Sequence, residues 1–164
     1  MKNMEYRFMQ LKAADPVIIA QITAIEQDAF GIGGMNAWFL PPFIRHGRVY
    51  VILNQEEVVA VAEYMRDYDD PCHAYLFGFV VNRAYRRQGF GKKLMTKSLD
   101  CLAQEGFKSV SLTVDPNNIA ALNLYRNLGF TQAEFLPNEY GKGEDRLVLT
   151  LQLADQEEVN NDSI

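Results

Sequence analysis

The chain has 164 residues, of which 48% are hydrophobic and 23% are charged, a composition typical of a folded globular protein. Its formal net charge of −5 argues against a protein that mainly coats nucleic acid, and no apolar run is long enough to cross a membrane or direct secretion. We therefore expect a cytoplasmic protein with no nucleic-acid or membrane partner. The two cysteines, Cys72 and Cys101, match neither a disulfide framework nor a metal-ligand spacing, so we expect no metal.

Hydrophobic periodicity predicts the elements of the first half of the chain. In order they are a strand at 6–12, a helix at 16–30, a short helix at 35–46, and a hairpin of strands at 48–53 and 58–65. Asp15 is a favourable N-cap for the first helix, because its side chain can accept hydrogen bonds from the first turn. Pro41 and Pro42 are expected to interrupt the second helix.

The second half of the chain alternates strands and helices. The predicted elements are a strand at 74–82, a helix at 89–105, a strand at 109–114, a helix from Asp115 to 128, and strands at 130–136 and 146–153. The nearly continuous apolar run at 74–82 is typical of a central strand covered on both faces. We expect Asp115 and the following proline to cap the helix that they precede, and the connection at 137–145 to be mobile.

This order of elements predicts an α/β (α+β) fold with a mixed, mostly antiparallel sheet of six to seven strands and helices on both faces. No linker divides the chain, so we expect a single domain over residues 1–153. Residues 154–164 carry four acidic residues and no basic one, which is typical of a solvated, disordered tail.

A basic turn with two glycines joins the strand at 74–82 to the next helix. Residues 83–93 contain five basic residues and no acidic one. A helix N-terminus has unpaired backbone N–H groups and partial positive charge, and glycine lets a ligand approach the backbone closely. Full charges come from Arg86, Arg87 and Lys92. This combination predicts a pyrophosphate site.

Two common phosphate-binding motifs do not fit this turn. A Walker A loop requires a glycine where Arg86 stands, and a dinucleotide fingerprint requires a third glycine where Leu94 stands. A basic turn that only begins a helix, without binding a ligand, is the alternative interpretation.

A second group of polar residues lies on the predicted helix that follows Asp115. Asn118 and Tyr125 are seven residues apart, so at 3.6 residues per turn they share one helix face, separated by about 10 Å along the axis. An amide and a phenol in this arrangement could line one groove. Alternatively, Asn118 only solvates the first turn, and Tyr125 is a core aromatic residue.

These residues together resemble the GNAT superfamily of acyl-CoA-dependent N-acyltransferases. Residues 86–91 (RRQGFG) look like its motif Arg/Gln-x-x-Gly-x-Gly/Ala, and residues 118–130 resemble its downstream signature. The resemblance covers about residues 74–153 and implies a GNAT-like sheet with a splayed central strand pair. It also implies acetyl-CoA as co-substrate. The implied coenzyme A contacts are Phe79, Val80, Val81, Arg86, Arg87, Gln88, Gly89, Phe90, Gly91, Lys92, Asn118 and Tyr125.

The resemblance also implies a role for these positions. Backbone groups of Phe79 and Val81 would pair with the pantetheine arm, and the amides of residues 86–91 would hold the pyrophosphate. Asn118 would bond to the pantetheine region, and the Tyr125 hydroxyl would lie near the thioester sulfur.

The implied reaction is attack of a primary amine on the acetyl carbonyl, which expels coenzyme A. Tyr125 is the candidate general acid, because a phenol can protonate the leaving thiolate. Many relatives place a glutamate base at positions that Tyr75 and Thr113 hold here, which puts that base in doubt. Glu63 on a neighbouring strand is our candidate base, directly or through water, although an ion-paired or solvated role fits it equally well.

The acceptor is not specified by any motif. Acidic residues that could attract a cationic amine, or form an ordinary solvated surface, are Glu26, Asp28, Glu63, Asp67, Asp69 and Asp70. A small-molecule amine and a peptide or protein N-terminus both fit, and Tyr140 could reach either. Dimers are common among proteins of this kind, but no residue here specifies a homodimer. A coenzyme A-binding sensor without catalysis is the alternative function.

Overall fold

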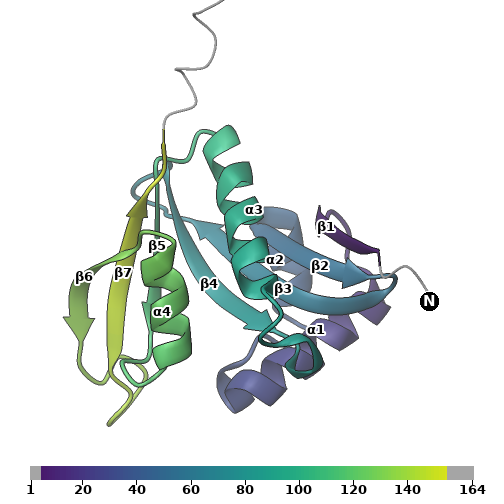
Figure 1. Cartoon of the computed structure of the whole chain (residues 1–164), viewed down its shortest axis with the longest axis horizontal. Coiled ribbons are helices and arrows are strands. Elements are labelled where there is room, and N and C mark those ends of the chain that lie inside the picture. Colours follow the sequence, from purple (N-terminus) through teal and green to yellow (C-terminus); the bar gives the residue numbers. More distant parts are fainter. Residues whose placement is uncertain (1–4, 155–164) are drawn as a thin grey trace, which may run out of the picture. The chain divides into compact units, whose positions relative to one another are not determined.

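The computed structural model describes residues 5–154. Its helices are α1 (Pro16–Phe30), α2 (Leu40–His46), α3 (Phe90–Gln104) and α4 (Ile119–Asn127). Its strands are β1 (Tyr6–Gln10), β2 (Arg48–Asn54), β3 (Glu57–Arg66), β4 (His73–Val81), β5 (Ser109–Val114), β6 (Thr131–Leu136) and β7 (Arg146–Gln152). The strands follow the order β1-β2-β3-β4-β5-β7-β6 in a seven-stranded sheet (Figure 1). The predicted α/β fold and its order of elements are confirmed.

The chain forms two compact units. Unit 1 contains Met1–Met65 and Leu76–Ser98, and unit 2 contains Arg66–Tyr75 and Leu99–Ile164, in each case as far as the residues are described. The acidic tail expected at 154–164 lies, from residue 155 onward, outside the described residues.

The β2–β3 hairpin forms the centre of unit 1. Its strands pair in antiparallel register from Arg48 opposite Tyr64 to Asn54 opposite Glu57, so its turn has two residues rather than the four expected. Because neighbouring residues of a strand point to opposite faces, β2 contributes to two cores. One face packs with apolar residues of α1 and α2, through Val49 and Val51 among others.

The opposite face of the hairpin meets the first half of α3. The hydroxyl of Tyr64 is 2.7 Å from the Ser98 Oγ, and the rings of Tyr64 and Tyr50 meet edge to face. All three side chains are buried. Within unit 1, helices therefore cover both faces of the strands, as Figure 1 shows for α3 in front and α1 and α2 behind.

Two helix starts in the N-terminal part show how local chemistry sets the boundaries. The Asp15 carboxylate accepts hydrogen bonds from the N–H groups of Val17 and Ile18, at 2.8 and 3.2 Å, which confirms it as the N-cap of α1. The expected effect of Pro41 and Pro42 is wrong. They lie in the first turn of α2, where a missing N–H costs nothing, so they begin that helix and do not interrupt it.

The burial predicted for β4 is also wrong. Only Ala74, Leu76 and Val80 are buried along this strand, and Phe77 is 49% exposed. The apolar run therefore does not indicate a strand covered on both faces. The aromatic ring of Phe77 instead lies 5.6 Å from that of Phe43 in α2, so part of its surface is covered by a neighbouring ring.

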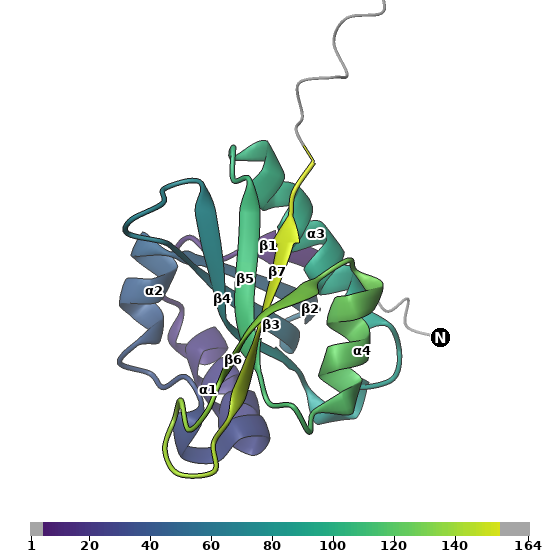
Figure 2. The same ribbon diagram turned by 90° about the vertical axis from the view of Figure 1, so that its left-hand side faces the viewer.

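Unit 2 is built on β5, β7 and β6, which pair in antiparallel register (Figure 2). The alternation expected in β5 is confirmed, because Val110, Leu112 and Val114 are buried and the residues between them are only partly covered. The helix cap expected at Asp115 is wrong. Asn118 caps α4 by accepting a hydrogen bond from the Ala121 N–H at 3.1 Å, while Asp115 accepts one from Asn117 within the preceding turn.

Two further observations concern residues 5–154 only. None of the helices there is long and apolar enough to cross a membrane. Nor does this part of the chain gather three or more His, Cys, Asp or Glu side chains in a group that could hold a metal ion.

Candidate active site

The basic turn forms an ordered loop at the N-terminus of α3 in unit 1. After β4 ends, Arg83–Tyr85 make one turn of 3-10 helix, and α3 begins at Phe90. Arg87 and Gly89 both have positive φ, at 61° and 83°, which turns the chain sharply into the helix. The first hydrogen bond of α3 runs from the Lys93 N–H to the Gly89 carbonyl, so the N–H groups just before Lys93 have no acceptor inside the helix.

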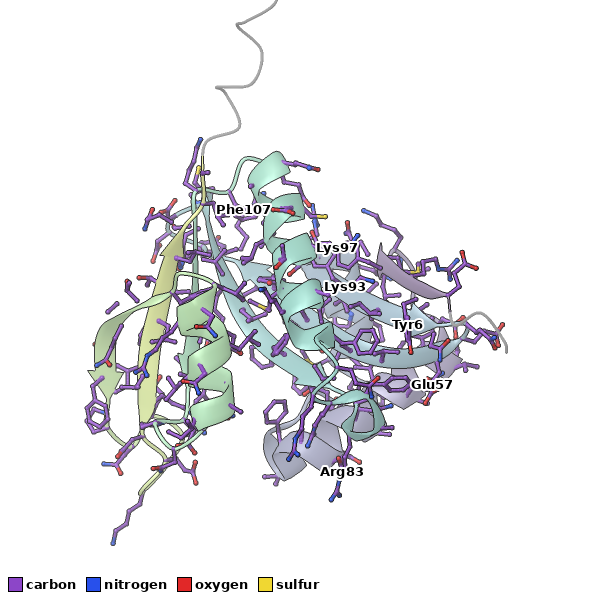
Figure 3. All side chains as sticks on the ribbon, viewed as in Figure 1. Tyr6, Glu57, Arg83, Lys93, Lys97 and Phe107 are labelled. Atoms are coloured by element: carbon purple, nitrogen blue, oxygen red, sulfur yellow. The ribbon has the colours of Figure 1, made fainter. Side chains whose placement is uncertain are left out.

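Three aromatic rings hold this loop against β1. The Phe90 ring lies 4.6 Å from that of Tyr6 and 5.9 Å from that of Tyr85. The Tyr85 hydroxyl donates to the Glu57 carboxylate and accepts from the Asn54 amide, both from the β2–β3 hairpin. Figure 3 shows Tyr6 and Glu57 on the same side of unit 1. The loop is therefore fixed by packing and hydrogen bonds before any ligand binds.

An open hollow of about 320 Å³ lies along the first turns of α3. It is lined by Gly89, Lys92, Lys93, Thr96 and Lys97. These positions are three or four residues apart, so they share one side of the helix, and Figure 3 shows Lys93 and Lys97 along it. Unpaired amides, the helix dipole and three lysines make this hollow suited to an anion with several charges.

The structure changes the expected role of one basic side chain. The Arg86 guanidinium donates through Nε to the Val81 carbonyl, at 3.1 Å, and so braces the loop against the end of β4. The side chains of Lys93, Thr96 and Lys97 were not predicted as site residues. Their helical spacing from Gly89 was the signal that could have found them.

A buried pair of carboxyl groups lies elsewhere in unit 1. Glu63 of β3 is fully buried and Glu26 of α1 is 2% exposed. The backbone N–H of Met35 donates to Glu26 Oε2 at 3.2 Å. Among the described residues, Glu63 Oε1 and Oε2 and Glu26 Oε1 have no hydrogen-bond partner beyond the contact of the two carboxyls with each other.

Burial shifts the protonation of both groups in the same direction. Loss of solvent is the main cause that raises the pKa of Glu63 well above its ordinary value, and repulsion from Glu26 raises it further. The pKa of Glu26 is also raised by burial, although the contacts with Glu63 and with the Met35 N–H oppose that change. The alternative of a solvated or ion-paired Glu63 is therefore not what the structure shows.

The second group of predicted residues lies in unit 2. Tyr125 is 6% exposed, with its ring 5.7 Å from that of Phe130, and burial raises the pKa of its phenol above the ordinary value. This phenol therefore keeps its proton throughout the neutral range. Asn118 is exposed and uses its side-chain oxygen for the cap of α4.

A row of side-chain hydrogen bonds joins β4 to β5 within unit 2. The two ring nitrogens of His73 lie 2.7 Å from the hydroxyls of Ser109 and Ser111, and the Tyr75 hydroxyl lies 3.0 Å from that of Thr113. Burial is the main cause that raises the pKa of Tyr75 to about 12, and the nearby Tyr140 adds to it. Tyr75 and Thr113, the two positions considered above for a glutamate base, thus bond to each other.

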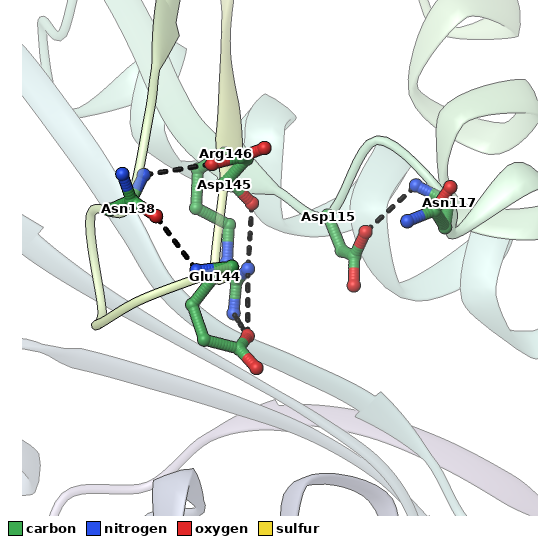
Figure 4. A network of polar contacts seen from close by, with 7 residues as sticks. Asp115, Asn117, Asn138, Glu144, Asp145 and Arg146 are labelled. Carbon is green, nitrogen blue, oxygen red and sulfur yellow. Dashed lines mark hydrogen bonds and ion pairs between the residues drawn. The ribbon is translucent and has the colours of Figure 1, made fainter.

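The connection expected to be mobile is a set of turns closed by its own hydrogen bonds (Figure 4). The Asn138 N–H donates to the Asp145 carboxylate at 2.8 Å, and the Asn138 side-chain oxygen accepts from the Gly143 N–H at 2.7 Å. The Arg146 guanidinium pairs with Glu144 at 3.3 Å and lies 4.9 Å from the Tyr140 ring centre. Tyr140 is 61% exposed at this turn.

Of the predicted site residues, unit 1 holds the basic loop at 86–92, the residues Phe79, Val80 and Val81, and Glu63. Unit 2 holds Asn118 and Tyr125. The sequence model of the Acetyltransferase (GNAT) family matches residues 19–130, which is more than half of the chain and includes all of these positions. The chain belongs to the Acetyltransferase (GNAT) family.

Two curated relatives show what the chain is similar to. N-alpha-acetyltransferase daf-31 of Caenorhabditis elegans is 34% identical over 103 residues, which are 62% of this chain and 57% of the relative. The ribosomal protein bS18-alanine N-acetyltransferase of Escherichia coli K12 is 35% identical over 85 residues, which are 49% of this chain and 57% of the relative. The chain thus spans a little over half the length of these curated relatives.

Solved structures share the fold at lower sequence identity. The crystal structure of the ribosomal-protein-S18-alanine N-acetyltransferase from Escherichia coli matches with a TM-score of 0.70 at 21% identity, over 94% of this chain and 98% of that one. Ard1 from Thermoplasma volcanium matches with a TM-score of 0.78 at 19% identity, over 92% and 99% of the two chains. A Bacillus subtilis acetyltransferase in complex with CoA matches with a TM-score of 0.71 at 15% identity, over 92% and 100%.

The buried carboxyl pair predicts an unusual dependence of stability on pH. The pKa of Glu63 is higher in the folded protein than in the unfolded chain, so its protonated form contributes to stability at a pH below the unfolded-state pKa. This contribution to stability is lost as the pH rises through the folded-state pKa. The side-chain amide of the Glu63→Gln variant is uncharged at every pH. We expect the free energy of unfolding of this variant to exceed that of the unmodified protein by on the order of 1 kcal/mol at pH 8, and by much less at pH 4.5.

Urea unfolding at the two pH values measures this difference. Glu56→Gln is the matched control, because Glu56 is exposed on the same hairpin, and it should not change with pH in this way. A Glu63→Gln variant that is less stable at pH 8 than at pH 4.5, relative to the unmodified protein, would contradict the prediction.

Proposed function

We propose that this protein is an N-acetyltransferase, which moves the acetyl group of acetyl-CoA to a primary amine, with the α-amine of a peptide or protein N-terminus as the favoured acceptor. The observation that carries the proposal is the preformed cationic loop at the N-terminus of α3 in a chain of this family. Relatives named for N-alpha and ribosomal-protein alanine acetylation support the choice of acceptor.

The loop fits the anionic part of coenzyme A. The unpaired amides before Lys93 are suited to the pyrophosphate, and the lysines of the hollow would pair with further negative charge. The backbone of Phe79, Val80 and Val81, at the end of β4, would hold the pantetheine arm. Asn118 would reach the same arm through its amide group, since its oxygen already caps α4.

The leaving group requires a proton donor. The thiol of coenzyme A, with a reference pKa near 8.5 for thiols, would leave as a thiolate unless a donor stabilises it. Tyr125 is our candidate, because burial raises the pKa of its phenol and keeps it protonated at neutral pH. As negative charge develops on the sulfur, this donor bond strengthens and the proton follows.

The acceptor amine must lose a proton before it attacks. At pH 7 an α-amine with a pKa near 7.8 needs only about 1 kcal/mol for this step, whereas a lysine-like amine with a pKa near 10.4 needs about 4.6 kcal/mol. Glu63 is our candidate base, and its raised pKa brings it closer to the pKa of an α-amine. The match is better for an N-terminus than for a lysine side chain.

Binding of acetyl-CoA can be tested at one glycine. Gly89 has positive φ and no atom near the place of a Cβ, so Gly89→Glu leaves space in the protein and adds negative charge to the loop. We expect at least a roughly 100-fold loss of affinity in calorimetry, because like charges in a binding site cost several kcal/mol. Gly106→Glu is the control, since Gly106 has the same kind of φ and the same open surroundings after α3. Equal affinities for the two variants would refute the phosphate site.

The proton donor can be tested by removing one oxygen atom. Tyr125→Phe should lower kcat by roughly 10²- to 10⁴-fold and leave acetyl-CoA affinity nearly unchanged, because only the general acid is lost. Tyr68→Phe, which removes the hydroxyl of a fully exposed tyrosine, should change neither value. A protein that binds acetyl-CoA but has no turnover with any amine would instead be the non-catalytic sensor.

The acceptor class can be tested with two peptides of one sequence that contains a single lysine. One peptide has a free N-terminus and the other a blocked N-terminus. We expect acetyl transfer to the first, located by mass spectrometry on the α-amine, and little transfer to the second, because its remaining amine is more costly to deprotonate. Equal transfer to both would move the acceptor class to ε-amines.

A further inference from the structure

Two carboxyl groups from distant parts of the chain converge on one glycine in unit 1. Glu26 comes from α1, Glu63 from β3, and Gly78 from β4. A Cβ on Gly78 would overlap Glu63 Oε2 and would lie 3.2 Å from Glu63 Cδ and 3.3 Å from Glu26 Oε1. The missing side chain of Gly78 is therefore what gives both carboxyl groups their place.

No described side chain balances the charge of this pair. Glu26 is the group that acts on Glu63 electrostatically, and the two residues beside Glu63 on the adjacent strands, Val49 of β2 and Gly78 of β4, carry no charge. The Met35 N–H also donates to Glu26 Oε2, at 3.2 Å. Two ionised carboxylates without a cation would be costly in this buried position.

A proton held between the carboxyls removes most of that cost. It satisfies one oxygen of each group and reduces the charge of the pair from two to one. The second oxygen of Glu63 still lacks a partner, although this side chain is fully buried. The Glu63 carboxyl lies against Gly78 of β4, one residue before Phe79, whose backbone we assign to the pantetheine arm.

We propose that Glu26 and Glu63 work as one unit that shares a proton, in which Glu63 accepts the proton of the acceptor amine across one water molecule and Glu26 is the positioning residue that sets the pH range of this step. The inference rests on the proposed acetyl transfer. It adds Glu26 and Gly78 to the residues that the reaction requires.

The proposed transfer moves two protons away from the amine nitrogen. The acceptor enters as R–NH₃⁺ and gives one proton through water to the singly protonated pair, which becomes neutral. The amine nitrogen then forms a bond to the acetyl carbon, the carbon–sulfur bond breaks, and a second nitrogen proton replaces the one that Tyr125 gives to the sulfur. The pair returns its extra proton to solvent, so the products are R–NH–acetyl, coenzyme A thiol and one proton.

The sharing of a proton can be tested in the protein without acetyl-CoA. ¹³C NMR of labelled glutamate carboxyls, assigned through Glu26→Gln and Glu63→Gln, should show that the two groups of the unmodified protein titrate in linked steps above the ordinary carboxyl range. Glu63 of the Glu26→Gln variant should titrate at lower pH, because the repulsion is gone and the amide can donate to the carboxylate. Independent titration of both groups near pH 4 to 5 would overturn the proposal.

The role in the reaction is tested by pH profiles of kcat/KM with the peptide acceptor. Glu63→Gln should lower kcat by roughly 10²- to 10⁴-fold across the profile. Glu26→Gln should retain more activity and move the ascending limb to lower pH, which a purely structural residue would not do. Gly78→Ala, which keeps both carboxyls but displaces Glu63, should also change this limb, and Glu56→Gln should not.

The outcomes separate this inference from the proposed function. If Gly89→Glu and the unmodified protein bind acetyl-CoA equally, the proposed function fails, while the NMR titration still decides whether a proton is shared. If acetyl transfer occurs but the Glu63→Gln variant retains full kcat, the role of the pair in catalysis is refuted. It is also refuted if the ascending limb of the kcat/KM profile lies at the same pH in the Glu26→Gln variant as in the unmodified protein.

Discussion

The packing that places the N-terminus of α3 is the constraint on which the candidate site depends. A helix end with unpaired N–H groups binds an anion well only if those groups already point to one place, because ordering a loose loop would consume part of the binding free energy. In this chain the rings of Tyr6, Tyr85 and Phe90 hold the loop, and the brace from Arg86 to the end of β4 closes it. The positive φ of Gly89 then turns the chain into the helix.

Unit 1 places its opposite charges in very different environments. The lysines along α3 are exposed, so they add attraction for an anion at little cost in folding free energy. Glu26 and Glu63 are buried without a cation, so they lower the stability of the folded protein as soon as both are ionised. A cost of this kind is typical of residues that serve a reaction rather than the fold. The net charge of −5 reveals neither environment.

Unit 2 contributes side chains that form hydrogen bonds with one another. His73 and Tyr75 bond to hydroxyls of β5, and burial keeps the phenols of Tyr75 and Tyr125 protonated. A protonated phenol can donate a hydrogen bond without carrying a net charge. Of the residues in our proposal, the carboxyl pair and the cationic loop belong to unit 1, and the candidate donor Tyr125 belongs to unit 2.

The sequence by itself determined the order of elements, the cap at Asp15, the β2–β3 hairpin and the loop motif at residues 86–91. These depend on neighbours within a few positions, which a single sequence displays directly. Tertiary structure alone decided that Glu26 meets Glu63 over Gly78, that Tyr125 is buried, and that Arg86 turns back to the strand. Each of these depends on which distant segments pack together, and burial then sets the protonation state. The burial of β4 was predicted wrongly for the same reason. An apolar run shows that a strand can be buried, but it does not show which segments will pack against that strand.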